Sequence, residues 1–131
     1  MKPFRLPADD LEFAVLCKLW DLGVASVRNL HDELGARDGL VYTTTAKVVD
    51  RLRAKGLIQR QRSGRAFVYR PRAAREEVEK ARAQNAVSRL LGAEPHAAVA
   101  ALVDAVDAVD PALLDELERL VAARRRSRHG A

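Results

Sequence analysis

The 131-residue chain has few of the residues that mark secreted or membrane proteins. Its single cysteine, Cys17, cannot form a disulfide within the chain, which favours a reducing, cytoplasmic location. The first ten residues, MKPFRLPADD, lack the apolar core of a signal peptide. No apolar run approaches the roughly 20 residues that a membrane span needs, so we expect no membrane partner.

Residues that carry catalysis or bind metals are also sparse. His31, His96 and His129 are scattered, and no pair has the spacing of metal ligands. No glycine-rich phosphate loop and no Ser/His/Asp or Cys/His arrangement can be placed. Cys17 falls beside the apolar stripe of a predicted helix, where a free cysteine is typically a small core residue. The sequence therefore predicts no enzyme, no metal site and no cofactor.

Positive charge, in contrast, is present in excess and is concentrated in one segment. The formal net charge is +5. Residues 47–72 alone carry nine basic residues against one acid, Asp50, a net charge of +8. The basic residues are Lys47, Arg51, Arg53, Lys55, Arg60, Arg62, Arg65, Arg70 and Arg72. Such a local excess attracts a polyanion more strongly than evenly spread charge does, so we expect nucleic acid as the partner.

Apolar residues at helical spacing predict three short helices in the N-terminal half. The first runs from residue 9 or 10 to residue 22 and ends at Gly23. The second covers residues 27–34, with Ser26 as its N-cap, and the third covers residues 43–55. Three helices joined by short turns indicate a helix-turn-helix, in which the third helix reads DNA.

The third helix has one polar face, formed by Thr43, Thr44, Lys47 and Arg51. Hydroxyls at a helix start reach bases or phosphates, lysine can bond to guanine acceptors, and arginine can reach bases or backbone. Tyr42 has two readings: its hydroxyl contacts a phosphate, or its ring packs as a staple at the helix start. The alternative interpretation is that these residues form an ordinary solvent-exposed helix face that does not contact DNA.

An arginine-rich hairpin follows the third helix. We expect strands over residues 57–62 and 65–70, with Ser63-Gly64 as the turn. Arg62 and Arg65 flank that turn, where they would touch phosphate or the minor groove. The fold class is thus mostly α with a minor β part: a winged helix-turn-helix over residues 1–72.

Residues 73–131 predict a second domain made of helices. Helical segments are expected over residues 73–91, broken by Gly92, and over residues 95–109. A last helix starts at Asp110-Pro111. It carries an apolar stripe, formed by Leu113, Leu117, Leu120 and Val121. We expect this stripe to be buried against a second copy of the chain. Residues 124–128 form a basic tail, expected to be frayed.

Several short groups of residues match a known family closely over residues 9–77. They are Leu11-Glu12, Val15-Leu16, Leu19-Trp20, Gly23 with Val27, Tyr42-Thr43-Thr44, Arg51-Leu52, Lys55-Gly56-Leu57, and Gly64-Arg65 with Tyr69 and Pro71. On these residues the chain resembles the penicillinase-repressor family, the BlaI/MecI/CopY group of bacterial winged-helix repressors. Beyond residue 77 only helical character and length agree.

The resemblance implies a homodimer, joined by its C-terminal helices and bound to an inverted-repeat operator in double-stranded DNA. It also implies that an inducing signal relieves repression. Copper-responsive members of the family have a C-terminal cysteine cluster, whereas this chain has only Cys17. Antibiotic-responsive members are cleaved by an inducer-activated protease, but residues 87–92 do not clearly reproduce their cleavage sequence. Induction by proteolysis therefore stays open.

These observations together predict a sequence-specific, dimeric transcriptional repressor. The alternative is a winged helix that serves as a protein-interaction module without sequence-specific DNA binding. That alternative predicts a neutral third helix, and Lys47, Arg51 and Arg65 argue against it.

Overall fold

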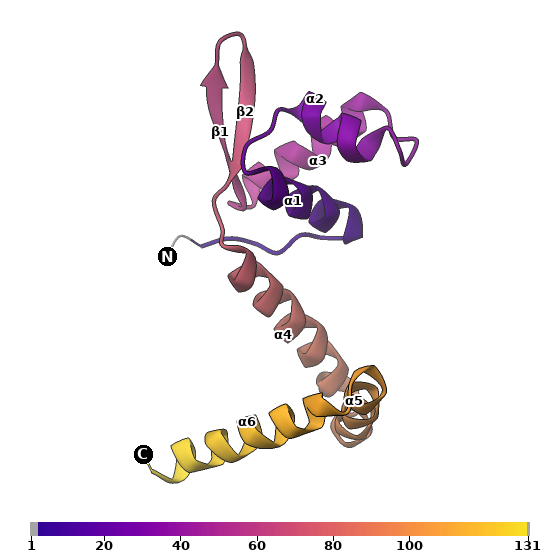
Figure 1. The fold of residues 1–131 in the computed structure, drawn as a ribbon, viewed down its shortest axis with the longest axis vertical. Coiled ribbons are helices and arrows are strands. Elements are labelled where there is room, and N and C mark those ends of the chain that lie inside the picture. The colour runs from indigo at the N-terminus through magenta and orange to yellow at the C-terminus, as the bar shows by residue number, and fades with distance from the viewer. Residues whose placement is uncertain (1–2, 131) are drawn as a thin grey trace. The chain divides into compact units, whose positions relative to one another are not determined.

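The computed structural model describes residues 3–130 and contains two compact units, the first ending at Ala83 and the second beginning at Gln84. It is mostly helical with one antiparallel hairpin, as the sequence predicted (Figure 1). The elements are α1 (Asp10–Leu22), α2 (Val27–Leu30), the π-helix η1 (His31–Gly35), α3 (Tyr42–Ala54), β1 (Ile58–Ser63), β2 (Ala66–Pro71), α4 (Arg75–Ala93), α5 (Pro95–Val109) and α6 (Ala112–His129).

Helix α1 begins and ends where its capping residues require. The Asp9 carboxylate accepts the backbone N–H of Glu12 at 2.9 Å and so caps the first turn. Gly23 has a backbone φ of +78°, a positive value that residues with a Cβ atom adopt only at an energetic cost. Its N–H donates to the Leu19 carbonyl at 2.7 Å and closes the helix.

The second helix differs from the prediction, because the continuous α-helix expected over residues 27–34 changes to a π-helix after Leu30. The widened turn is closed by the Ala36 N–H, which donates to the His31 carbonyl at 2.8 Å. The buried His31 ring shares a 2.8 Å hydrogen bond with the Thr45 hydroxyl on α3. A Cβ at Gly35 would clash with both groups. The π-helical turn therefore accommodates the hydrogen bond between His31 and Thr45, a residue of a different helix.

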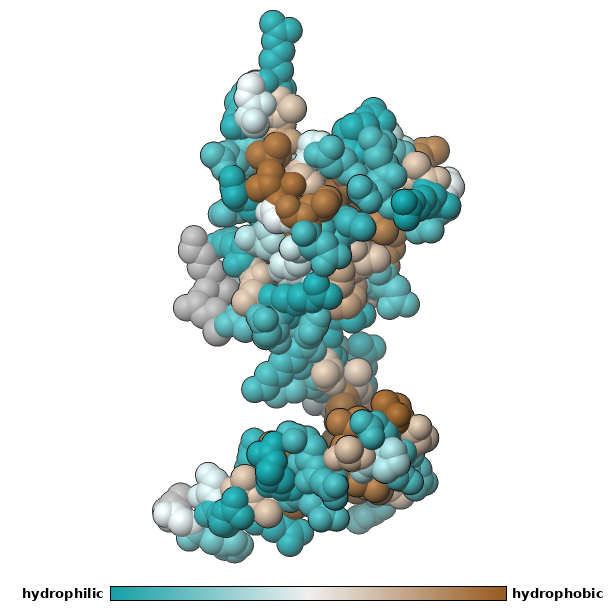
Figure 2. Space-filling model, viewed as in Figure 1, coloured by the Kyte–Doolittle hydropathy of each residue, from teal (hydrophilic) through white to brown (hydrophobic). Residues whose placement is uncertain are grey.

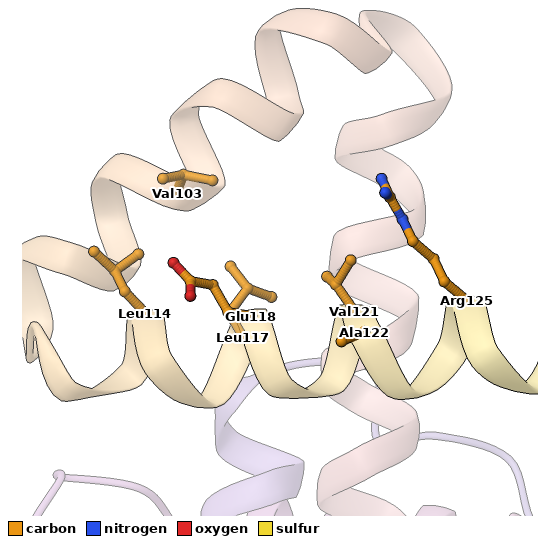
Figure 3. A pocket seen from close by; sticks show the side chains of 7 residues that line it. All are labelled: Val103, Leu114, Leu117, Glu118, Val121, Ala122 and Arg125. Atoms are coloured by element: carbon orange, nitrogen blue, oxygen red, sulfur yellow. The ribbon is translucent and has the colours of Figure 1, made fainter.

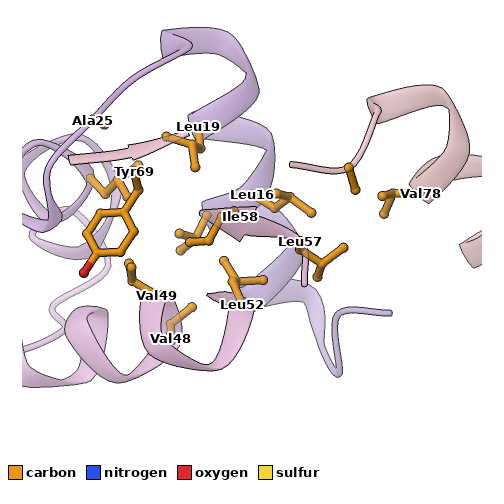
Figure 4. Close-up of a cluster of buried hydrophobic side chains, with 13 residues drawn as sticks. Leu16, Leu19, Ala25, Val48, Val49, Leu52, Leu57, Ile58, Tyr69 and Val78 are labelled. Atoms are coloured by element: carbon orange, nitrogen blue, oxygen red, sulfur yellow. The ribbon is translucent and has the colours of Figure 1, made fainter. Parts of the chain in front are cut away.

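One apolar core joins the helices of the first unit to the hairpin (Figure 4). Side chains from α1, α2, α3, the hairpin, α4 and the segments that connect them form it: Val15, Leu16, Leu19, Ala25, Leu30, Val48, Val49, Leu52, Leu57, Ile58, Tyr69, Ala73 and Val78. Ala25 and Tyr69 exchange backbone hydrogen bonds of 3.1 and 2.7 Å. Ala25 thus forms a single isolated bridge to β2.

The hairpin forms with a turn displaced by one residue from the prediction. Ser63 pairs with Ala66, so the two loop residues are Gly64 and Arg65 rather than Ser63 and Gly64. Gly64 has a φ of +64°, as the first loop residue of a II′ turn requires. Arg65 therefore lies in the turn itself. The second strand ends at Pro71, one residue later than expected.

The first unit reaches beyond the domain boundary expected at residue 72. Val78, on the first turns of α4, is fully buried in the core described above. The Trp20 indole N–H donates to the Ala73 carbonyl at 3.1 Å. The beginning of α4 therefore packs as part of the winged-helix unit.

The C-terminal unit has longer helices than predicted and no core of its own. Helix α4 continues through Gly92, and the basic residues 124–128 are helical within α6, where positive charge complements the C-terminal end of the helix dipole. The Asp110 carboxylate accepts the Ala112 N–H at 3.0 Å, as its predicted capping role requires. Between residues 84 and 130 no side chain is buried, and apolar residues gather over α5 (Figure 2).

We expect a fragment of residues 1–83 to be more stable than one of residues 1–72. The shorter fragment loses Val78 from the core and the Ala73 carbonyl from Trp20. Removing one fully buried valine exposes apolar surface worth about 1.5–3 kcal/mol. Urea unfolding of both fragments measures the difference, and equal midpoints with equal slopes would show that α4 adds nothing to this core.

Candidate nucleic-acid interface

Helix α3 divides into a buried face and an exposed face. Thr45, Val48, Val49 and Leu52 are buried in the core. Of the residues predicted to read DNA, Thr43, Lys47 and Arg51 are exposed, and Thr44 is half-buried at the edge. The structure therefore puts the predicted polar face in solvent. Asp50, which the prediction did not include, is exposed as well.

The N-terminus of α3 is open to a ligand. Its N-cap residue is Val41, which provides no side-chain cap. The N–H groups of Thr44 and Thr45 bond to the Val41 carbonyl at 3.0 and 3.4 Å. An uncapped helix start, with the positive end of the helix dipole, suits a phosphate group.

Tyr42 packs at the helix start, and its packing brings an additional arginine to this end of α3. Its ring lies edge-on to the His31 ring with the centroids 5.6 Å apart, and the Arg28 guanidinium lies 4.4 Å from the Tyr42 centroid. The Tyr42 ring thus packs at the helix start, but against His31 and Arg28 and not as a staple on its own helix, while 38% of the residue stays exposed. Sequence reasoning missed Arg28, because only the folded turn brings it beside Tyr42.

Arg51 is tethered by a buried carboxylate, a contact that no local pattern of residues predicts. Glu12 on α1 is only 2% exposed. Its carboxylate accepts the Ala8 N–H at 3.1 Å and pairs with Lys55, and its second oxygen lies 3.4 Å from Arg51 Nε. The Arg51 side chain remains 54% exposed. One edge of its guanidinium therefore faces the protein, and the arginine is held in a defined position on the surface.

In the hairpin, two arginines stack on one aromatic ring. The guanidinium carbons of Arg60 and Arg62 lie 4.1 and 5.5 Å from the Phe67 centroid. Arg62 pairs with Phe67 across the strands, and its Nε donates to the Gly64 carbonyl at 3.4 Å. Stacking orders the guanidinium planes while it leaves their N–H edges open to phosphate. Arg60 was missed, although it lies two residues before Arg62 and so on the same face of the strand.

The predicted dimerisation residues divide between two surfaces of α6. Leu117 and Val121 line a groove of about 550 Å³ between α5 and α6, whereas Leu113 and Leu120 are exposed outside it. The groove is lined by Val103, Leu114, Leu117, Glu118, Val121, Ala122 and Arg125 (Figure 3). The C-terminal unit therefore leaves apolar surface uncovered both inside the groove and beside it.

Cys17 is half-buried on α1. Burial raises the pKa of its thiol above the ordinary value, and Arg75 partly opposes that rise. A raised pKa leaves less of the reactive thiolate. In the part of the chain that the structure describes, no three His, Cys, Asp or Glu side chains are grouped to hold a metal ion. Within the same residues, no helix is both long and apolar enough to cross a membrane.

Comparison with known proteins agrees with this architecture. Residues 9–123 match the penicillinase repressor family. The transcriptional regulator BlaI of Mycobacterium tuberculosis, in strains CDC 1551 / Oshkosh and ATCC 25618 / H37Rv, is 38% identical over 115 residues, which cover 86% of this chain and 81% of the relative. The family and this relative are transcriptional regulators, not enzymes.

A solved structure supports the fold. The DNA binding domain of the repressor BlaI matches with a TM-score of 0.51 and 24% identity, over 56% of this chain and 92% of that domain. At this level of identity the likeness identifies the fold, a winged helix.

We expect Glu12→Ala to destabilise the protein by about 1–3 kcal/mol, because it removes the buried acceptor of Lys55 and of the Ala8 N–H. Glu12→Gln keeps an acceptor without the charge and should fall between Ala and the unchanged protein. The control is Glu33→Ala, which removes a more exposed pair with Lys18 at 3.7 Å and should cost less than about 1 kcal/mol. Equal losses for the Glu12 and Glu33 variants in urea unfolding would mean that the Glu12 cluster has no special role.

Proposed function

Because this chain belongs to the penicillinase repressor family, we propose that it is a DNA-binding transcriptional repressor that acts as a homodimer on an inverted-repeat operator. The observation that carries the proposal is the concentration of positive charge, +8 over residues 47–72, on the exposed face of α3 and on the hairpin. The fold holds this charge on rigid elements, which suits recognition of a regular polyanion.

In this proposal α3 enters the major groove. Thr43 and Thr44, at the uncapped helix start, contact phosphate or base edges, and Lys47 reaches guanine acceptors one turn later. Arg51 contacts the DNA backbone, since its link to Glu12 restricts how far the side chain can reach. The uncapped start of α3 and the exposure of Lys47 support this docking.

The hairpin acts as the wing. Arg60 and Arg62, ordered on Phe67, and Arg65 in the turn contact phosphates or the adjacent minor groove. These contacts contribute affinity for any duplex, whereas α3 supplies the preference for particular base pairs.

Dimerisation belongs to the C-terminal unit. Residues 84–130 include no buried side chain, and a second copy would cover the apolar surface of α6 both outside the groove, at Leu113 and Leu120, and inside it, at Leu117 and Val121. A two-fold dimer presents two α3 helices to successive major grooves, so it requires half-sites related by inversion. The bound dimer then represses by occluding the promoter.

The proposal includes release of the DNA by an inducing signal, which the family resemblance implies. If the signal is a protease, the segment around residues 87–92 is its target only after local unfolding, because these residues are helical within α4. The rival function, a protein-interaction module, predicts no binding to duplex DNA at low salt. Filter binding with random duplex at low and high salt separates the two.

We expect the loss of a basic residue from α3 and from the wing to change DNA binding in different ways. Lys47→Ala should cost about 1–3 kcal/mol on an operator selected from random-sequence DNA and relax preference at particular base pairs. Arg65→Ala should weaken operator and random DNA by similar factors and lower the salt slope by roughly one unit. Both variants are titrated on both DNAs across a salt series. The reverse pattern would exchange the assigned roles of helix and wing.

We expect Leu120→Asp to weaken self-association by about tenfold or more, because a carboxylate would be buried between two copies. The side chain is exposed in the single chain, so the substitution leaves the packing of each chain intact. Sedimentation over a range of concentrations measures the effect. An unchanged dimer would exclude this face, and operator binding by the variant should weaken in parallel with the loss of dimer.

A further inference from the structure

One exposed acid lies at the edge of the proposed reading face of α3, on the side of the helix that faces away from the core. At about 100° per residue, Asp50 is within about 60° of Lys47 around the helix and almost in line with Thr43. The buried Val48, Val49 and Leu52 occupy the opposite side. A helix that inserts its outward face into a groove therefore inserts Asp50 together with Lys47.

The carboxylate of Asp50 has no partner among residues 3–130. No ion pair or side-chain hydrogen bond involves it in this part of the chain, although the surrounding segment is strongly basic. Lys47 and Arg53 lie three residues away on either side, yet neither forms an ion pair with Asp50, and the positions four residues away are Ala46 and Ala54. The adjacent Arg51 is bound to Glu12.

The helix dipole does not favour the negative charge of Asp50 either. Asp50 lies in the C-terminal half of α3, and an acid near that end gains nothing from the helix dipole. The carboxylate also repels any phosphate that approaches the face. A base that offers a hydrogen-bond donor to the carboxylate can offset this repulsion. In the major groove, the N4 amino group of cytosine is the donor that Asp and Glu accept from.

We propose that Asp50 is a specificity-determining residue, which accepts a hydrogen bond from the N4 amino group of a cytosine in each half-site. DNA without that cytosine leaves the carboxylate unpaired against the negative backbone and binds more weakly. Asp50 thus discriminates mainly by penalising the wrong sequences. This inference rests on the proposed DNA-binding function and adds a base and a mechanism to it.

The test compares Asp50→Asn and Asp50→Ala with a control, Glu76→Gln. Glu76 is also an exposed acid of the first unit, but it lies on α4, away from α3. Operators are selected from random-sequence duplex with the unchanged protein and with Asp50→Ala. Each protein is then titrated with the selected operator, with operators changed at single base pairs, and with random duplex.

We expect both Asp50 variants to bind random duplex more tightly and the selected operator no better. The ratio of the two affinities should fall by about tenfold or more, the size of one base contact. The pool selected by Asp50→Ala should lose one cytosine that the unchanged protein requires, and replacing that cytosine should no longer weaken binding by the variant. Glu76→Gln should leave the ratio and the selected sequence unchanged.

Two results would overturn the inference. If Asp50→Asn increases the affinity for operator and for random DNA by the same factor, the residue only repels phosphate and contacts no base specifically. If neither variant changes binding to any DNA, Asp50 does not meet the duplex. Failure of the proposed function is a separate outcome, because the unchanged protein would then select no sequence at all. Unfolding midpoints of all variants check that each is folded.

Discussion

The need to bury one face of α3 governs the rest of the N-terminal unit. Val48, Val49 and Leu52 are fully buried against side chains of α1 and the hairpin. Because successive helical residues are separated by about 100°, burial of these three residues turns Lys47 and its neighbours outward. The surface that meets DNA in our proposal is therefore a consequence of core packing. Any substitution that rotated α3 in the core would also rotate that surface.

The buried Glu12 carboxylate adds a polar constraint to this apolar one. A buried charge is costly unless ion pairs and hydrogen bonds compensate for it, and here Lys55, Arg51 and the Ala8 N–H do so together. Those partners come from the segment before α1 and from the far end of α3. The cluster thus adds polar contacts at the C-terminal end of α3, next to the buried Leu52, and it restrains a surface arginine with the same carboxylate.

The features that could be predicted from the sequence are those that depend on neighbouring residues. The extent of α1, the capping roles of Ser26 and Asp110 and the hairpin all follow from local spacing and caps. The predictions were incomplete or wrong where contacts between residues distant in the sequence determine the local structure. The π-helix fits the bond between His31 and Thr45, and Glu12 reaches Arg51 across α1 and α3. No periodicity reveals such contacts, so the exposed face of α3 was predicted but the restraint on Arg51 was not.

The two units also differ in the interactions that stabilise them. The first contains a closed core, whereas residues 84–130 bury no side chain and form a groove lined by Leu114, Leu117 and Val121. Packing of an apolar face provides most of the stability of a helix in a protein, so in the proposed dimer α5 and α6 would gain theirs chiefly when a second copy covers them. In the proposed repressor, folding of the arm and dimerisation are then one equilibrium that depends on protein concentration. Occupancy of a two-half-site operator would therefore fall more steeply on dilution than the affinity of a single winged helix would require, and an inducing signal need only unfold the arm to release the DNA.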